Sequence, residues 1–208
     1  MIKSGLTLTV VFNAQSANYG EGFGNITVLK KMTGTDGNMY SYISRQAIRY
    51  NIVRQLGWDN TPVKVSEKQG GDKGVVQFAP EATIKDYPEI DLFGYMKTTS
   101  RSDTSSGSAT TRAAVCRLSN AVSLVPYNYD VDYLNNMGLA KRQVGLENSI
   151  AQSEIHHSLY AYTITVDLDR VGIDVEIEID NKKKADRVKK LLEAGECRYR
   201  DIKGRREN

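Results

Sequence analysis

Few side chains in this sequence have the types and spacing that catalysis requires. The two histidines, His156 and His157, are adjacent and point apart in an extended chain, so a histidine-based metal or acid–base site is not expected. There is no Gly-x-Ser-x-Gly motif, and Cys116 and Cys197 lie far apart without a Cys-x-x-Cys pair. Any catalytic chemistry therefore has to come from carboxylates.

Asp36 is the one carboxylate that we single out for metal-assisted RNA cleavage. It lies between Thr35 and Gly37, in the connection from the first predicted strand to the first predicted helix. An Asp-Gly pair is also an ordinary turn signal, and the turn is the simpler interpretation.

A second group of side chains is suited to holding an anion or a base. Arg45 and Arg49 are four residues apart near the start of a predicted helix, so they share one face. The polar segment before them, residues 13–25, contains alternating glycines whose spacing differs from the dinucleotide-binding fingerprint. Twelve tyrosines against four phenylalanines add rings that can stack on bases, although half-buried packing is the simpler interpretation for any single one.

The charge is unevenly distributed along the chain. The 208 residues carry 28 Lys and Arg against 25 Asp and Glu, for a net charge of +3. Residues 182–206 hold 11 of the basic residues and only four of the acidic ones. Such a stretch suits a polyanionic partner, and it is also typical of a solvated helix face.

The composition excludes several classes of protein. The apolar runs are too short to cross a membrane, and the first residues do not resemble a signal peptide, so we expect a cytoplasmic protein with no membrane partner. Two separated cysteines with no ligand cluster fit a reducing compartment and offer no structural zinc site. We expect no cofactor and no metal.

Alternating and helical periodicities predict a mixed α+β fold. The order is strand, helix, strand, strand, helix, as in an RNA-recognition or ferredoxin-like domain without its last strand. The chain stops at Asn208, where that strand should begin, so either the assigned order of elements is wrong or the chain is shortened. The predicted elements are strands at 6–12, 92–96, 114–125, 159–168 and 173–179, a helix capped by Ser41 or Ser44 and ended by Gly57, and a last helix capped by Asn181 with Ala185, Val188, Leu191 and Leu192 as its buried stripe.

Three segments are predicted as insertions into one domain that spans residues 1–208. They lie at about 59–90, 97–113 and 126–158. The second is rich in Ser and Thr and is expected to be a mobile loop. The third is 33 residues long, and a connection of that length inside a compact domain is usually functional.

Two runs in order resemble a known family. They are residues 13–25, NAQSANYGEGFGN, and residues 42–50, YISRQAIRY, followed by the sequence DLFG at 91–94. These runs resemble the DevR-like branch of the CRISPR-associated backbone proteins, a branch of the RAMP superfamily whose members polymerise along guide RNA in type I-B effector complexes. The likeness extends from Gly5 to about Lys203.

The resemblance implies an RNA-recognition-type palm, finger-like insertions and a thumb, which we place at residues 126–158. It implies a non-enzymatic subunit with guide RNA, a target DNA strand, copies of itself and other type I effector subunits as partners. A subunit that accepts any guide sequence should bind phosphate and sugar rather than base edges. The RNA-binding residues that we predict are Asn18, Tyr19, Asn25, Ser44, Arg45, Gln46, Arg49, Arg101, Lys141 and Arg142, and the predicted thumb contacts are Leu134, Met137 and Leu139.

Two alternative functions stay open. One is a metal-dependent RNA endonuclease subunit that uses Asp36. The other is a DNA-binding autoregulator, although the sequence has no visible helix-turn-helix pattern.

Overall fold

The computed structural model describes most of the chain as two compact units. The first unit contains residues 1–8, 50–118 and 164–197, and the second contains residues 9–49, 119–163 and 198–208. The described residues are 4–15, 18–22, 24–65, 74–98, 109–142, 145, 147, 150–196, 201–202 and 205–206. Among them no helix is both long enough and apolar enough to cross a bilayer.

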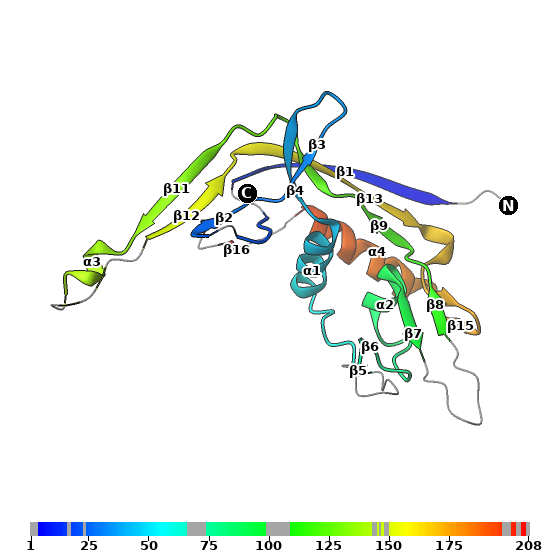
Figure 1. Ribbon diagram of the computed structural model, residues 1–208. Coiled ribbons are helices and arrows are strands. Elements are labelled where there is room, and N and C mark those ends of the chain that lie inside the picture. The colour runs from blue at the N-terminus through cyan, green and yellow to red at the C-terminus, as the bar shows by residue number, and fades with distance from the viewer. Residues whose placement is uncertain are drawn as a thin grey trace. The chain divides into compact units, whose positions relative to one another are not determined.

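The largest sheet contains the strands that the sequence predicted most clearly (Figure 1). Strand β1 alternates between exposed and half-buried residues along its length, as predicted from its period of two. Strands β1 and β13 contribute residues to both units. The strand order is β1-β13-β10-β4-β3, with β9 also paired to β13; the bounds are β1 Gly5–Ala14, β3 Lys31–Thr33, β4 Met39–Ile43, β9 Cys116–Leu118, β10 Ala121–Ser123 and β13 Ser158–Asp167.

The predicted strand at 114–125 is in fact two strands. Both β9 and β10 pair antiparallel with β13, as expected for its partner. Between them Ser119 exchanges hydrogen bonds with Thr163, through its backbone N–H and its hydroxyl. The polar pair at 119–120 interrupts the strand, and this break places Asn120 at the start of α1.

Helix α1 (Arg45–Gln55) follows β4 directly. Ser44 is its cap, because the Ser44 hydroxyl accepts the Ala47 N–H at 3.3 Å, whereas Ser41 lies within β4. Gly57 has a φ of 64°, the left-handed conformation that commonly follows a helix, as predicted. Ile48 and Ile52 are fully buried on one face of α1.

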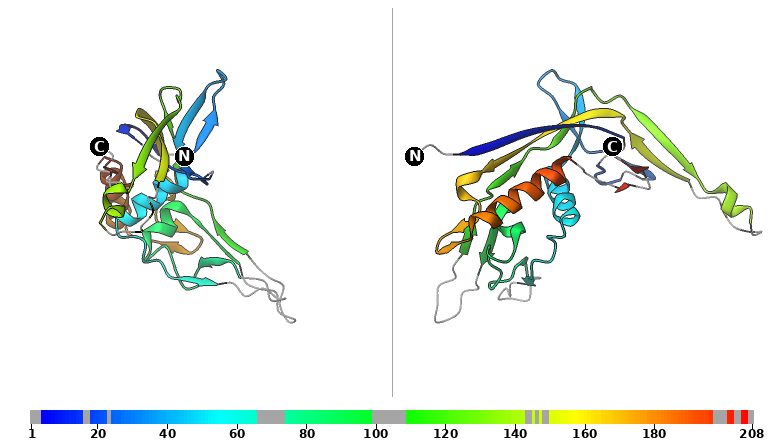
Figure 2. Two further views of the ribbon diagram at one scale, coloured as in Figure 1. Left: turned by 60° about the vertical axis from the view of Figure 1, so that its left-hand side comes forward. Right: turned by 180° about the vertical axis from the view of Figure 1, so that it is seen from behind.

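In the second unit the thumb is a hairpin rather than an irregular loop (Figures 1 and 2). Its strands β11 (Asp130–Asn135) and β12 (Ile150–Ile155) pair antiparallel, and α3 (Met137–Ala140) follows β11 at the far end. Strand β2 (Ile26–Thr27) adds a third, parallel strand to β12. The core of this unit contains Phe12 stacked on Tyr160.

In the first unit, three short antiparallel strand pairs, β5–β6, β7–β8 and β14–β15, accompany the helices. A buried cluster of Ala82, Ile84 and Ile90 packs against Phe78 and Tyr95. The remaining elements are β5 Val63–Val65, β6 Val76–Phe78, α2 Pro88–Phe93, β7 Tyr95–Thr98, β8 Ala109–Arg112, the 3₁₀ helix η1 Leu168–Arg170, β14 Ile173–Asp174, β15 Ile177–Glu178 and α4 Asn181–Glu196; β16 Asp201–Ile202 and β17 Arg205–Arg206 form a separate pair.

Several predicted elements of the first unit were wrong in detail. Residues 92–93 end helix α2, and the strand begins only at Tyr95, after Gly94 with a φ of 73°. Residues 97–98 and 109–112, expected in a mobile loop, are paired in the β7–β8 hairpin. The predicted strand at 173–179 is a two-stranded hairpin, because Val175 has a φ of 45° and reverses the chain.

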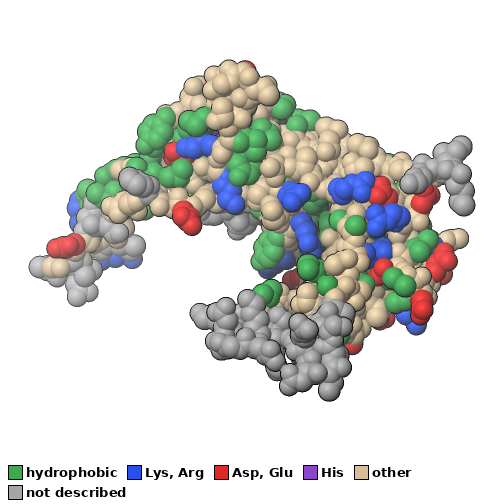
Figure 3. Space-filling view, turned by 45° about the vertical axis from the view of Figure 1, so that its right-hand side comes forward, with side chains coloured by type: hydrophobic (Ala, Val, Ile, Leu, Met, Phe, Trp, Pro, Cys, Tyr) green, Lys and Arg blue, Asp and Glu red, His purple; other side chains and the backbone are tan. Residues whose placement is uncertain are grey.

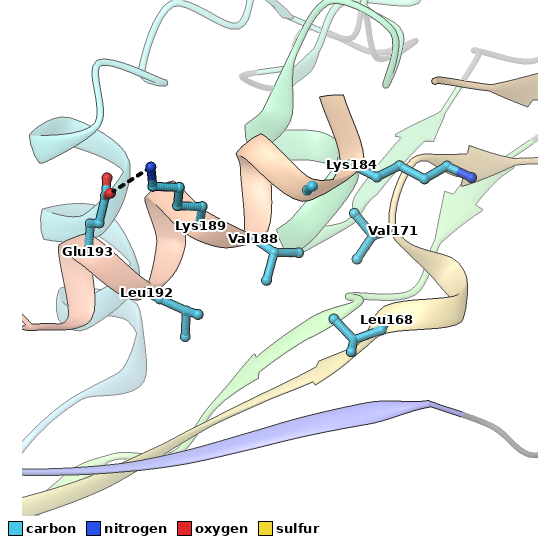
Figure 4. A pocket seen from close by; sticks show the side chains of 8 residues that line it. Leu168, Val171, Lys184, Val188, Lys189, Leu192 and Glu193 are labelled. Carbon is cyan, nitrogen blue, oxygen red and sulfur yellow. Dashed lines mark ion pairs between the residues drawn. The ribbon is translucent and has the colours of Figure 1, made fainter. Parts of the chain in front are cut away.

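Helix α4 also differs from its prediction. Its first turn is capped by Asp180 rather than Asn181, since the Asp180 carboxylate accepts the Lys183 N–H at 2.9 Å. Leu191 is buried in the predicted stripe, but Ala185 is exposed. Leu192 and Val188 line a shallow groove opposite Leu168 and Val171 (Figure 4).

The first unit contains a buried cluster of charges at Asp91. The Asp91 carboxylate lies 2.7 Å from both the Arg112 and Arg187 guanidinium groups and accepts the Gly172 N–H. Arg112 also donates to the backbone oxygens of Arg170 and of Asp91 itself. One carboxylate thereby links α2, β8, α4 and the turn after η1.

Candidate nucleic-acid interface

In the second unit, the first turn of α1 collects residues from three segments. The Asn18 side-chain oxygen accepts the Ser44 N–H at 3.2 Å, and the Asn120 side-chain oxygen accepts the Arg45 N–H at 2.9 Å. With the Ala47 N–H bonded to the Ser44 hydroxyl, three backbone donors at this helix start already have protein partners.

This bonding changes which groups can meet a phosphate at the helix start. The backbone N–H groups of Ser44, Arg45 and Ala47 already donate to protein oxygens. The side chains of Arg45 and Gln46 are exposed, and no acidic residue lies in the first turn. An anion at this point would therefore be bound by side chains, assisted by the helix dipole. Arg49, one turn later, is half-buried.

The glycine-rich segment before α1 is folded back on itself. The Asn18 carbonyl accepts the Lys30 N–H, and the Gly20 N–H donates to the Val28 carbonyl. The Asn25 carbonyl accepts the Gln152 N–H of the thumb. The described residues of this segment, 18–22 and 24–30, therefore form a short hairpin that is hydrogen-bonded to the thumb.

Glu154, which no sequence signal singled out, joins this hairpin to the root of the thumb. Its buried carboxylate accepts the Leu29 N–H at 2.8 Å, and both of its oxygens lie 2.7 Å from Lys31 Nζ. Its backbone carbonyl accepts the Tyr19 hydroxyl at 3.0 Å. The Lys31 ammonium also lies 4.5 Å from the centre of the Tyr127 ring, a cation–π contact. Burial, followed by the nearby Glu154 charge, raises the pKa of Tyr127 to about 12.

A second buried group at the thumb root is built on His156. Its Nδ1 lies 2.7 Å from the Ser41 hydroxyl, which lies 2.6 Å from the Tyr160 hydroxyl. Burial lowers the pKa of His156, so the neutral ring is favoured. His156 and His157 connect β12 to β13. The hydrogen-bonded role of His156 was not predicted.

The far end of the thumb is exposed. Leu134 and Met137 are 52% and 46% exposed, and Lys141 and Arg142 are exposed just after α3. Hydrophobic side chains run along the thumb in the space-filling view (Figure 3). The side chain of Leu139 and all of Arg101 lie outside the described residues. The thumb thus presents apolar and basic groups together.

Asp36 lies in a tight turn between β3 and β4. Its carboxylate accepts the Tyr40 hydroxyl at 2.6 Å and the Asn38 side-chain and backbone N–H groups. The Tyr40 hydrogen bond, followed by those of Asn38, lowers the pKa of Asp36. In the described part of the chain, no three His, Cys, Asp or Glu residues lie close enough to hold a metal ion. These contacts are those of a turn, and the cleavage hypothesis stays a prediction.

Comparison with known proteins identifies the family. The model of the family DevR, described as "CRISPR-associated negative auto-regulator DevR/Csa2", matches residues 6–196, and the chain belongs to this family. A curated relative is the "CRISPR-associated protein Cas7/Cst2/DevR" of Myxococcus xanthus (strain DK1622), 28% identical over 123 residues. That match covers 56% of this chain and 40% of the relative, so it spans less than half of the relative's length.

Solved structures share the fold. A chain of a "CRISPR RNA-guided surveillance complex, pre-nicking" matches with a TM-score of 0.61 at 12% identity, covering 92% of this chain and 71% of that chain. A chain of a "CRISPR RNA-guided surveillance complex" matches with a TM-score of 0.55 at 13% identity, covering 92% of this chain and 60% of that chain. The predicted mixed α+β class and the predicted family are confirmed. The single RNA-recognition-type domain stays a prediction.

Proposed function

We propose that this chain is a guide-RNA-binding backbone subunit of a type I CRISPR surveillance complex. The observation that carries the proposal is the start of α1, where Asn18 and Asn120 hold the Ser44 and Arg45 backbone. This arrangement leaves the Arg45 and Gln46 side chains exposed beside the helix start. Membership of the DevR family supports the same role.

RNA binding in this proposal is independent of sequence. Arg45 and Gln46 donate to phosphate and sugar oxygens, which carry no base information. The helix dipole of α1 adds a favourable field for the anion. The bases then remain free to pair with a target DNA strand.

The thumb supplies the contact between successive copies. Its exposed Leu134 and Met137 can wedge against bases or a neighbouring copy, while Lys141 and Arg142 are placed to meet phosphate. Copies arranged in this way coat the guide RNA, and other type I effector subunits complete the assembly. We place this assembly in the cytoplasm.

A binding comparison tests the proposal. Fluorescence anisotropy would compare single-stranded RNA of several sequences with duplex DNA at matched salt. We expect tighter binding to RNA, with no preference among RNA sequences and a strong salt dependence. Equal or tighter binding to duplex DNA would contradict the proposal and favour the autoregulator.

We also propose that the chain does not cleave RNA. The assembled complex would be incubated with complementary RNA and Mg²⁺, in wild type and in Asp36→Ala. We expect intact RNA with both proteins. Cleavage by the wild type that Asp36→Ala abolishes would instead establish the endonuclease.

A further inference from the structure

Deepening the proposed function, on which it rests, we infer that the Lys31–Glu154 ion pair positions the thumb. The pair fixes the direction in which the thumb leaves the sheet with respect to the start of α1. It thereby sets the distance along the RNA between the contacts made near Arg45 and those made by the thumb.

The pair has the connections that this role requires. Glu154 belongs to β12 of the thumb, and Lys31 belongs to β3. Strand β3 pairs with β4, with Lys31 opposite Ser41, and β4 leads through Ser44 into α1. One ion pair therefore links the thumb to the strand pair that positions the proposed phosphate contacts.

The geometry of the pair restrains orientation. Lys31 Nζ contacts both oxygens of the carboxylate, and the third contact, from the Leu29 N–H, reaches Oε2 from the hairpin. The two side chains are only 17% and 5% exposed, so water screens their attraction weakly. These three contacts are directional, whereas apolar packing is not, so they restrain the rotation of β12.

Several described positions toward the far end of the thumb are exposed. Tyr133, Leu134 and Asn135 on β11 are exposed, as are Ile150 and Ala151 on β12. At the root, Glu154 bonds to Tyr19, Leu29 and Lys31, and Gln152 donates to the Asn25 carbonyl. A small rotation at Glu154 is therefore amplified along the hairpin.

The role goes beyond stability. Replacing a buried ion pair by neutral groups of similar shape often leaves stability unchanged, whereas the best-attested use of such pairs is to fix one register. Stability and position can thus be separated by two variants. Glu154→Gln keeps an acceptor for the Leu29 N–H but leaves Lys31 without its charge partner, and Lys31→Met/Glu154→Gln neutralises both partners.

The test measures thumb position without RNA. Spin labels at Thr35→Cys, in the β3–β4 turn, and Asn135→Cys, at the end of β11, both lie at exposed sites of the second unit. Cys197 is replaced by Ser, and burial raises the pKa of the Cys116 thiol to about 12, which keeps it unreactive. Asp186→Asn, which removes an exposed ion pair on α4, is the control.

We expect one narrow distance distribution in the wild type and the control, and a broadened or shifted one in Glu154→Gln. In the double variant we expect the unfolding midpoint to return toward the wild-type value, while the distance distribution stays broadened or shifted. The inference would be overturned if the distance distribution were unchanged in both variants. It would also be overturned if the distribution recovered together with stability in the double variant, because the pair would then contribute only to stability.

RNA binding gives the functional half of the test. Both variants should keep their affinity for an oligonucleotide that spans one site but lose between about twofold and about 30-fold on RNA that spans several sites. Equal affinity losses on short and long RNA would contradict positioning. If the wild type bound no RNA, the proposed function would be wrong. The distances between the spin labels would still show whether the ion pair positions the thumb.

Discussion

The side-chain oxygen of Asn18 lies 3.2 Å from the backbone nitrogen of Ser44, so the glycine-rich segment holds the cap of α1. In the sequence, strands β2, β3 and β4 lie between these two residues. Their hydrogen bond makes Asn18 a residue that shapes the proposed RNA site, in addition to any contact of its own.

Asn18→Ala and Asn18→Asp should separate the effect of losing the hydrogen bond to Ser44 from the effect of adding a negative charge near the proposed phosphate. The Ala variant leaves the Ser44 N–H without its acceptor and should lower the free energy of unfolding by about 1–3 kcal/mol. The Asp variant keeps the acceptor and should stay near wild-type stability, but its negative charge should weaken RNA binding. Urea denaturation and anisotropy would measure the two effects. Full RNA affinity in a folded Asn18→Asp protein would contradict a phosphate near α1.

Arg45→Ala and Arg49→Ala should each weaken RNA binding without changing sequence preference. Each lost phosphate contact should flatten the slope of log K against log salt by about 0.7 for a single strand. Arg117→Ala is a control with the same charge change, since Arg117 is paired with Asp167. If the slopes of both variants matched that of Arg117→Ala and the wild type, the RNA path would lie elsewhere.

Deleting residues 135–142 should remove the end of the thumb without unfolding the protein. The residues described there are mostly exposed, so little buried surface is lost. We expect a cooperative unfolding transition together with loss of the multi-subunit ladder on long RNA, seen by electron microscopy. The alternative is that the thumb is a cap on its own domain, in which case the deletion lowers stability. Normal ladders from the deletion variant would exclude the thumb assignment.

Asp91→Asn should destabilise the protein strongly. The substitution removes the charge partner of Arg112 and Arg187, both of which stay buried. Breaking such a pair costs about 3–5 kcal/mol. In guanidinium titrations the exposed pair at Asp186 and Lys190 is the comparison, and Asp186→Asn should cost only about 0.3–0.5 kcal/mol. Similar losses for the two variants would contradict a central role for Asp91.

His156 should make the protein sensitive to mild acid. Burial lowers its pKa in the folded state below the usual value of 6.5, so the unfolded chain takes up the proton first. The contribution of neutral His156 to the free energy of unfolding is therefore fully present above about pH 6.5, and it is lost as the pH falls toward the pKa of His156 in the folded state. The lowered pKa values of Asp167 and Asp180 act in a separate window, because their contributions are present above about pH 3.8 and lost below it.

His156→Gln keeps a polar partner for Ser41 and should flatten the free energy of unfolding between pH 7 and pH 5. His157→Gln, at the exposed neighbour, is the control. The same pH dependence in wild type and His156→Gln would show that another group carries it.

Local patterns predicted the strands and the helix that surround the site. The alternation in β1 and β13 depends only on neighbouring residues, and so does the Ser44 cap of α1. The alternation at 173–179 wrongly predicted one strand. The chain reverses at Val175, which breaks the strand but leaves the alternation of apolar residues intact. The apolar run at 92–96 was equally compatible with helix, and Pro88 at the start of α2 was the overlooked signal.

The contacts that assemble the site could not be predicted from local patterns. Asn120 reaches Arg45 across 75 residues, and Glu154 reaches Lys31 across 123. Asp91 and Arg187 are 96 residues apart. Charged residues usually favour the surface, so nothing in the neighbourhood of Glu154 or Arg187 indicated burial. Such pairs follow from the topology, which a single sequence does not provide.

The most direct test of RNA binding by this chain is the nucleic acid that copurifies with it from cells that express a guide RNA. Native mass spectrometry would weigh the assembly, and nuclease treatment with RNase or DNase would identify the nucleic acid. We predict RNA of a single guide length carrying more than one copy of the chain. Protein that emerges free of RNA, or bound to duplex DNA, would contradict the account.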